Sequence, residues 1–237
     1  MEVFHFWVTT TLILKLMKNS KNAFQSKKPI FSFVIDGKCE LWYLQLLKRH
    51  ERLNINIEPR LPQKKKLQDQ LEAVKTLTKE SGKVFWIIDF DTILKETRET
   101  KKGNKAPLQK FQELYNKCKK NEKIVIVINN PCLEYWFLQH FEQTSKYFET
   151  YEQLEKSLKK YLSDYEKTEK YYKNSRQNIY QKLESKLPIA KANAEELGEF
   201  TFDNAQKAVT EMYKIFDLLE CCAQARNSVN GKFEGLE

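Results

Sequence analysis

The sequence predicts an α/β protein: a mainly parallel sheet flanked by helices, with a helical layer at its C-terminal end. Three observations carry this prediction. Short apolar runs alternate with helical patterns up to about residue 145, as expected for strands joined by crossover helices. The runs at residues 84–88 and 124–128 are continuously apolar, which is typical of strands covered on both faces. Beyond residue 145 only helical patterns remain.

Each element of the α/β part follows from local spacing. Leu41, Leu44 and Leu47 recur at helical intervals, and Ile55 alternates with Ile57 as in a strand. The expected elements are a strand at residues 29–35, a helix at 40–49, a strand at 54–59, a helix from Pro62 to Gly82, a strand at 84–88, a polar loop at 92–107, a helix at 108–119, a strand at 124–128 and a helix at 134–141.

The C-terminal third is expected to be helical throughout. One apolar stripe is surrounded by lysines and consists of Tyr147, Tyr151, Leu154, Leu158, Tyr161, Leu162 and Tyr165. Such a stripe either packs against the protein body or stacks on nucleic-acid bases while the lysines meet phosphates. A second helix is expected at residues 175–187, stopped by Pro188, and Asp203 is expected to cap a third. Exposed aromatic residues here would suit a homodimer or packing within the chain.

We divide the chain into three parts: an N-terminal extension and linker at residues 1–28, an α/β domain at 29–145 and a helical part at 146–230. The apolar stretch at residues 4–14 is too short to span a bilayer. It lacks the flanking features of a signal peptide. Met17 is an alternative start, and a short helix that packs on the body is the other interpretation.

Composition indicates a polyanion as partner. The chain has 237 residues, with 41 Lys and Arg against 32 Asp and Glu, a net charge of +9. That balance favours nucleic acid or an anionic surface, or it reflects a lysine-rich solvated surface. The five cysteines form no C-x-x-C pair, which argues against a structural zinc site. They fit buried thiols in a reducing cytoplasm, and no membrane partner is expected.

Acidic residues follow three of the predicted strands. Asp36 and Glu40 follow the first, Asp89 and Asp91 come directly after the strand at 84–88, and Glu134 follows the strand at 124–128. The carboxyl ends of parallel strands are where α/β proteins bind ligands. Carboxylates gathered there favour a hard divalent cation such as Mg²⁺. In an extended chain Asp89 and Asp91 would point to the same side. We therefore predict Mg²⁺-dependent phosphodiester chemistry.

Each of these residues also has a purely structural interpretation. Asp36 precedes Gly37 in what could be an ordinary strand-to-helix turn, and Glu40 could simply complement a helix dipole. Asp89 and Asp91 could cap a helix or meet the lysines of the following loop. Cys132 lacks the positive surroundings of a reactive thiol.

Taken together, these residues resemble the RloB family, small proteins of bacterial restriction-modification and abortive-infection loci. The most specific match is N-P-C-L-E-Y-W at residues 130–136, followed by Leu138, His140 and Phe141. The segments at residues 33–40, 88–91 and 161–167 are similar to three further family motifs. The resemblance extends roughly from Pro29 to Leu219.

The RloB family is similar in turn to Toprim domains, which implies a Toprim-like fold and a nuclease activity in defence against phage. By that resemblance Asp36, Asp89 and Asp91 would be catalytic and hold Mg²⁺ or Mn²⁺. Glu40 would be a further catalytic residue, and Glu134 a further metal ligand. The residues expected to bind nucleic acid, DNA or RNA, are Lys38, Lys101, Lys102, Lys105, Lys167 and Lys170. The implied partner is an ATPase of the ABC or OLD type.

The chain departs from the family pattern at informative places. Asp36 stands where Toprim domains have Glu, so its carboxylate is one methylene shorter. Cys39 replaces a usual Thr, and Phe90 lies inside the D-x-D motif. These departures keep open a rival hypothesis, a non-catalytic module that binds nucleic acid or the ATPase. A nucleotidyl or phosphoryl transferase is a weaker alternative, because the sequence contains no P-loop.

Overall fold

The structure is a computed structural model that describes residues 31–35, 37–53, 55–58 and 66–230, with side chains described up to Cys222. The predicted extension at residues 1–28, Asp36 and Pro62 therefore lie outside the described residues. The chain divides into two compact units. One spans Pro29–Tyr213, and the other contains Lys214–Glu237 together with Met1–Lys28.

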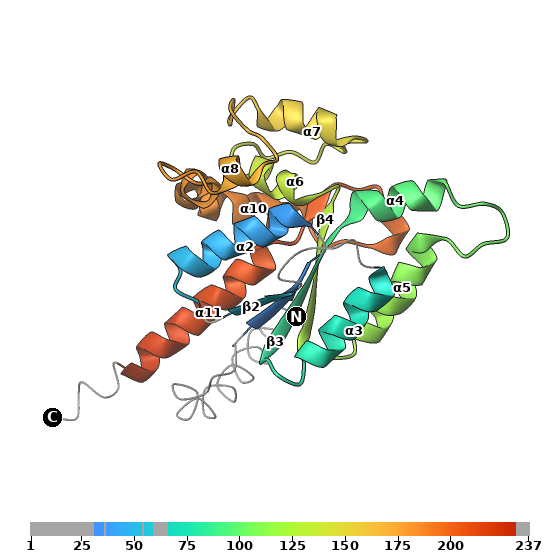
Figure 1. The fold of residues 1–237 in the computed structure, drawn as a ribbon, viewed down its shortest axis with the longest axis horizontal. Helices are drawn as coiled ribbons and strands as arrows, with labels where there is room; N and C mark the ends of the chain where they lie inside the picture. Colours follow the sequence, from blue (N-terminus) through green and yellow to red (C-terminus); the bar gives the residue numbers. More distant parts are fainter. Residues whose placement is uncertain (1–30, 36, 54, 59–65, 231–237) are drawn as a thin grey trace. The chain divides into compact units, whose positions relative to one another are not determined.

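The centre of the larger unit is a five-stranded sheet in the order β2-β1-β3-β4-β5 (Figure 1). Its strands are β1 (Phe31–Val34), β2 (Ile55–Glu58), β3 (Lys83–Asp89), β4 (Ile124–Asn130) and β5 (Val209–Thr210). β1 pairs in parallel with β2 and β3, and β3 pairs in parallel with β4. Only the pairing of β4 with β5 is antiparallel among the described residues. The predicted α/β class with a mainly parallel sheet is thus confirmed.

Helices cover both faces of this sheet (Figure 1). One face carries α3 (Leu67–Leu77), α4 (Phe90–Arg98) and α5 (Pro107–Cys118). The other carries α2 (Lys38–His50) and α6 (Leu133–Gln139). The remaining helices of this unit are α7 (Tyr151–Leu158), α8 (Glu169–Tyr172), α9 (Ile179–Leu183) and α10 (Leu187–Leu197), with short 3-10 turns at Glu184–Lys186 and Phe202–Asn204. α11 (Tyr213–Asn230) begins at the boundary of the two units.

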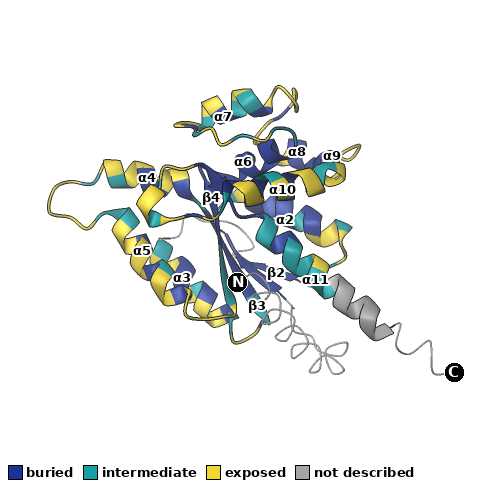
Figure 2. Ribbon diagram, turned by 180° about the vertical axis from the view of Figure 1, so that it is seen from behind, coloured by how far each residue is buried: buried dark blue, intermediate teal, exposed yellow. Residues whose placement is uncertain are grey.

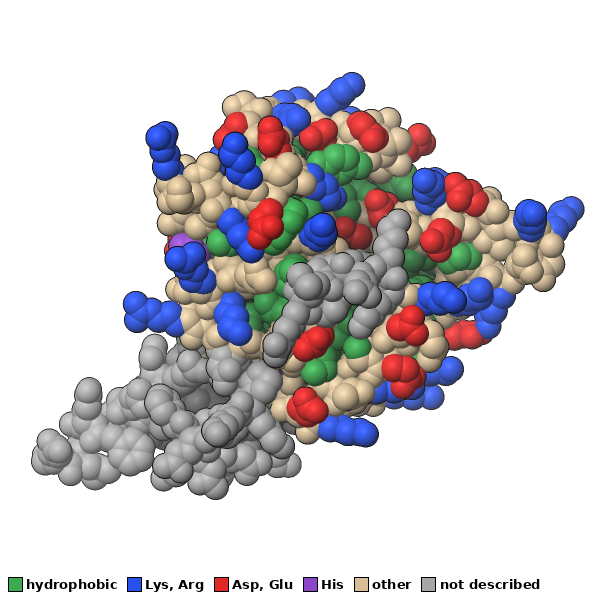
Figure 3. All heavy atoms as spheres, viewed as in Figure 1, with side chains coloured by type: hydrophobic (Ala, Val, Ile, Leu, Met, Phe, Trp, Pro, Cys, Tyr) green, Lys and Arg blue, Asp and Glu red, His purple; other side chains and the backbone are tan. Residues whose placement is uncertain are grey.

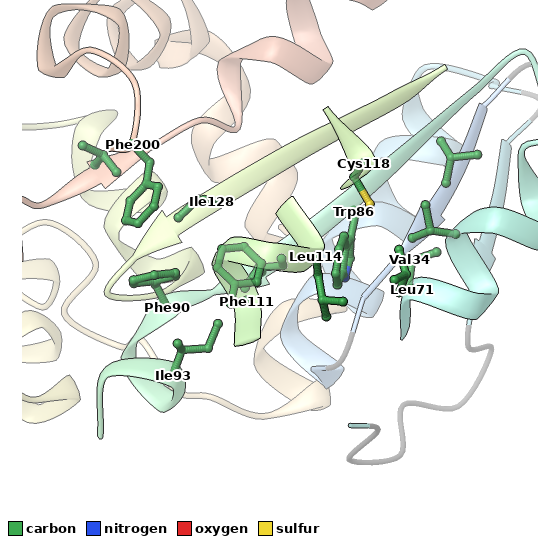
Figure 4. Close-up of a cluster of buried hydrophobic side chains, with 14 of the residues drawn as sticks. Val34, Leu71, Trp86, Phe90, Ile93, Phe111, Leu114, Cys118, Ile128 and Phe200 are labelled. Atoms are coloured by element: carbon green, nitrogen blue, oxygen red, sulfur yellow. The ribbon is translucent and has the colours of Figure 1, made fainter. Parts of the chain in front are cut away.

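An apolar core fills the space between the sheet and α3–α5. Phe111 of α5 lies at its centre, with its ring centroid 6.1 Å from that of Trp86 and 5.6 Å from that of Phe90. Leu71, Val74 and other buried residues of the strands and helices complete the cluster (Figure 4). This burial explains why the strand runs are continuously apolar.

The prediction of a loop at residues 92–107 is wrong for the first half of this segment. α4 begins at Phe90 and ends at Arg98, so the connection to α5 is shorter than predicted. Phe90, Ile93 and Leu94 are buried, and their i, i+3, i+4 spacing gives the helix an apolar stripe. The charged residues around these three positions hid that stripe.

The C-terminal region consists of shorter and more numerous helical segments than predicted. The tyrosine stripe is not one helix, because α7 ends at Leu158 and α8 starts only at Glu169. Pro188 does not stop a helix but lies in the first turn of α10, a position where its missing N–H costs nothing. The helix expected after Asp203 is instead a 3-10 turn, then β5, then α11.

Two further observations concern the cysteines and the membrane. Cys39, Cys118 and Cys132 are buried free thiols, as the sequence predicts, whereas Cys221 and Cys222 are free but only partly buried. Among the described residues, no helix combines the length and the apolar character needed to cross a membrane.

Candidate functional site

Asp89 is the last residue of β3, at the carboxyl edge of the sheet. Asn129 lies opposite it in register on β4. The Asn129 side chain donates from Nδ2 to Asp89 Oδ1 at 3.5 Å and accepts from Thr210 Oγ1 at 2.7 Å. A polar chain that starts on β5 therefore orients the Asp89 carboxyl group.

Glu40 lies in the first turn of α2, with only 4% of its surface exposed. Its carboxylate packs against the backbone of Gly37, the residue that precedes the helix. A Cβ atom at Gly37 would lie 2.0 Å from Glu40 Oε2. The missing side chain at position 37 is therefore what allows Glu40 to fold back over the start of its own helix.

Glu134, in the first turn of α6, is fully buried. Its Oε1 accepts a hydrogen bond from Tyr165 Oη at 2.8 Å and lies 3.0 Å from the ammonium group of Lys167. The Tyr165 hydroxyl also lies 2.8 Å from that of Tyr172. Glu134 Oε2 has no hydrogen-bond partner among the described residues. One oxygen is thus held by the C-terminal region, whereas the other points into a buried space beside the Cys132 thiol, whose pKa Glu134 raises. α6 is buried over its whole length (Figure 2).

Electrostatics shows that these carboxylates are gathered in one place. Burial raises the pKa of Asp89, and the nearby charges of Glu40, Glu134 and Asp91 raise it further, against an opposing effect of Lys167. A carboxyl group whose pKa is raised both by burial and by several neighbouring carboxylates is a candidate for a functional site.

Asp91 joins the cluster by a route different from the one predicted. The chain turns into α4 at Phe90, so Asp91 belongs to the first helical turn and is exposed. Its Oδ1 accepts from the backbone N–H of Thr92 at 2.5 Å and from Thr92 Oγ1 at 3.2 Å. The extended-chain argument that placed Asp89 and Asp91 side by side is therefore wrong, although Asp91 does act on Asp89 electrostatically.

The predicted nucleic-acid lysines fall into two groups. Lys167 lies in the acidic site, where burial lowers its pKa but the combined attraction of Glu134 and the other acidic groups around it raises the pKa overall. The other five are exposed: Lys38 at the start of α2, Lys101, Lys102 and Lys105 in the α4–α5 connection, and Lys170 on α8. Lys105 forms an ion pair with Glu113. In the view of Figure 3, basic and acidic side chains alternate over the visible surface without a large area of one sign.

Sequence reasoning missed the partners that reach the site from the C-terminal region. Tyr165 and Tyr172 were grouped with a packing stripe or not singled out at all. A buried carboxylate such as that of Glu134 needs a hydrogen-bond donor, and this need is a signal that such partners exist. No spacing in the sequence shows which residue provides the donor.

Two thiols border the same cluster. Burial, followed by the charge of Glu134, raises the pKa of Cys39 to about 12 and that of Cys132 well above its usual value. Both thiols therefore stay protonated at neutral pH, which agrees with the expectation that Cys132 is no nucleophile.

The donor set is of the chemical type that hard divalent cations prefer. It consists of carboxylate oxygens, one of which is buried without a partner, and their mutual repulsion is what a cation would relieve. No three His, Cys, Asp or Glu side chains within the described ranges lie close enough together to hold a metal ion by themselves. Asp36, which was predicted to complete the set, lies outside the described residues.

The fold and the site together define an α/β protein with an acidic cluster at the carboxyl edge of a parallel sheet. A family model for RloB-like proteins matches residues 31–219. The chain therefore belongs to the RloB-like family, as its motifs indicate. Searches against curated proteins and against solved structures find no match.

Proposed function

We propose that the protein is a nuclease that uses Mg²⁺ or Mn²⁺ at the carboxyl edge of the sheet. The observation that supports this most is the convergence of charge on Asp89: three other carboxylates raise its pKa, and one of them, Glu134, has a buried oxygen without a partner. Such a cluster is costly unless a cation or a shared proton compensates it.

The residues would divide the work as follows. Asp89 and Glu134 would hold the cation, with Asp91 and Asp36 completing its ligands. Held by these residues, a divalent cation would supply stabilisation of the charge on the attacking and leaving oxygens of a phosphodiester. Glu40, held against Gly37, would orient water. Lys167 would draw the phosphate towards the site while it keeps Glu134 in place.

The family supports a proposal for the biological setting. By the resemblance of its motifs to RloB-like proteins of abortive-infection loci, we propose a role in phage defence in the cytoplasm. An ATPase of the ABC or OLD type would gate the activity. The lysines of the α4–α5 connection would contact the phosphate backbone of DNA or RNA.

One observation favours a second candidate, a non-catalytic module that binds nucleic acid or the ATPase. Within the described ranges, no three side chains are arranged to hold a metal. In such a module the acidic cluster would share protons, and Mg²⁺ would be dispensable.

The test compares the wild type with Asp89→Asn on DNA and on tRNA-rich RNA, with Mg²⁺, Mn²⁺ or EDTA. Asp69→Asn, a change at an exposed carboxylate of α3, is the matched control. We expect metal-dependent cutting that Asp89→Asn abolishes and Asp69→Asn preserves. Mg²⁺ should also raise the melting temperature of the wild type but not of Asp89→Asn.

Cutting that persists in EDTA or in Asp89→Asn would refute the proposal. If neither cutting nor a metal-dependent shift is seen, even with the ATPase added, the binding module is favoured.

A further inference from the structure

Two aromatic rings stack on the surface beyond the far end of α6. The rings of Phe141 and Tyr161 are nearly parallel, with an interplanar angle of 8° and centroids 5.1 Å apart. Tyr161 is 43% exposed, which is unusual for a large hydrophobic residue in the described part of the chain. Its stacking on Phe141 sets the plane of the exposed ring, and its hydroxyl donates to Glu142 Oε2 at 3.0 Å.

The surroundings of this pair are basic and apolar. The ammonium group of Lys186 lies over the Phe141 ring, 5.4 Å from its centroid. Ile189, one turn further along the chain and 49% exposed, stands at i+3 from Lys186. Lys160, next to Tyr161, is exposed. A fixed, exposed ring with cations beside it is the combination that binds unpaired bases and their phosphates.

The aromatic pair and the acidic site lie at opposite ends of α6. Glu134 belongs to the first turn of this helix, whereas Phe141 follows its last residue, Gln139. Tyr161 contacts Phe141, and Tyr165 contacts Glu134. The segment 161–165 therefore runs beside α6 and joins the two places. Seven helical residues span about 10 Å, which matches the rise of about three stacked nucleotides along one strand.

We propose that Tyr161, backed by Phe141 and flanked by Lys186 and Lys160, is a stacking site for an unpaired base of a single-stranded nucleic acid. The base lies about three nucleotides from the phosphate that enters the acidic site. This names a substrate class for the proposed nuclease and rests on that function. A duplex cannot use the site, since its bases are already stacked on one another. The Glu142 carboxylate accepts a hydrogen bond from the Tyr161 hydroxyl. Its negative charge therefore offsets the positive charge of the two lysines only in part.

The test is binding of the full-length protein to short fluorescent oligonucleotides in EDTA, where no cutting can occur. We expect Tyr161→Ala to weaken binding of single-stranded DNA or RNA on the order of tenfold, the usual loss per stacked base, and Tyr161→Phe to bind as the wild type. Lys186→Met should weaken binding, whereas Lys119→Met should not. Lys119 lies over the ring of Tyr115 in a similar pair on the other face of the sheet. Thermal melting of each variant confirms folding.

The outcomes separate this inference from the proposed function. Equal binding by wild type and Tyr161→Ala overturns the stacking site, even if Asp89→Asn abolishes cutting. Equal loss of duplex and single-strand binding in Tyr161→Ala also overturns it. If Tyr161→Ala loses only its association with a protein such as the ATPase, the surface is a protein interface and the inference is wrong. Selective loss of single-strand binding supports it, even if the protein cuts nothing.

Discussion

The two faces of the sheet are covered by different kinds of buried side chain. On the α3–α5 face, rings and aliphatic side chains fill the core, and a buried polar contact there joins Trp86 Nε1 to Gln70 Oε1 at 2.8 Å. On the α2–α6 face, buried polar groups are frequent. Tyr43, Glu134, His140, Tyr165 and Tyr172 all lie there, each nearly or fully buried.

This difference indicates that one face mainly stabilises the fold and the other mainly forms the site. The apolar face supplies stability through close packing, which depends more on the volume of the side chains than on the direction of their contacts. The polar face depends on hydrogen bonds between particular atoms, which are costly when one partner is missing. The acidic cluster lies where this polar face meets the carboxyl edge. The molecule can hold several carboxylates together there because the opposite face provides the stability.

The largest effect on stability is expected from Phe111→Ala on the apolar face. Phe111 is fully buried and its ring touches Trp86, Phe90 and Phe202. Its truncation should lower the free energy of unfolding by about 3–5 kcal/mol, the range for a buried Phe. Urea unfolding measures the change. Phe111→Leu keeps most of the volume and should cost clearly less. Equal losses for both variants would contradict a packing role.

His140 on the polar face should make the protein sensitive to acid. Its Nδ1 bonds to the carbonyl of Trp136 at 2.9 Å, and its Nε2 is buried without a partner among the described residues. Burial lowers its pKa from 6.5 to about 4. The unfolded chain then binds more protons than the folded chain between these values, so stability falls as the pH drops from about 6.5 to about 4.

The expected loss over that interval is about 3 kcal/mol, from the pKa difference. Unfolding free energies of wild type and His140→Leu, measured at several pH values, isolate this contribution from the carboxylates. The wild type should lose stability more steeply than the variant. Parallel curves would show that His140 is accessible to a proton in the folded state.

The contrast between the faces also explains what the sequence could predict. Strands β3 and β4 were predicted because continuous apolar runs follow directly from burial on both sides. The gathering of Glu40, Asp89 and Glu134 was predicted because parallel strands end at one edge. Both inferences use only local pattern and a general rule of topology.

The remainder depends on contacts between distant residues. Tyr165 meets Glu134 across 31 positions of the chain, and Thr210 meets Asn129 across 81, and no periodicity records such pairs. β5 has two residues, too few for any alternation to be seen. Pro188 was interpreted as a stop because proline ends helices as readily as it begins them. The metal, the nuclease activity and the partner remain predictions.

A smaller effect is expected from Tyr165→Phe. The change removes the hydroxyl that joins Glu134 to Tyr172 and leaves the volume intact. Buried groups left without a partner cost about 1–3 kcal/mol, so the free energy of unfolding should fall by that amount. Tyr161→Phe, which removes an exposed hydroxyl bonded to Glu142, is the control and should change stability by less than about 0.5 kcal/mol. Equal effects would mean that the buried network contributes nothing specific.

The smallest effect on stability, with the most specific effect on function, is expected from Gly37→Ala. The backbone at Gly37 is extended, with φ −110° and ψ 157°, so alanine causes no strain there. The added methyl group would overlap Glu40 Oε2 and push that carboxylate aside. Because only the end of the Glu40 side chain has to move, stability should fall by no more than about 1 kcal/mol, whereas metal-dependent cutting should fall on the order of a hundredfold if Glu40 orients water. A double-mutant cycle with Glu40→Ala provides the decisive comparison. Once the Glu40 carboxylate is gone, Gly37→Ala should have no further effect on the cutting rate. A second loss of the same size in the Glu40→Ala background would show that Gly37 acts through another contact.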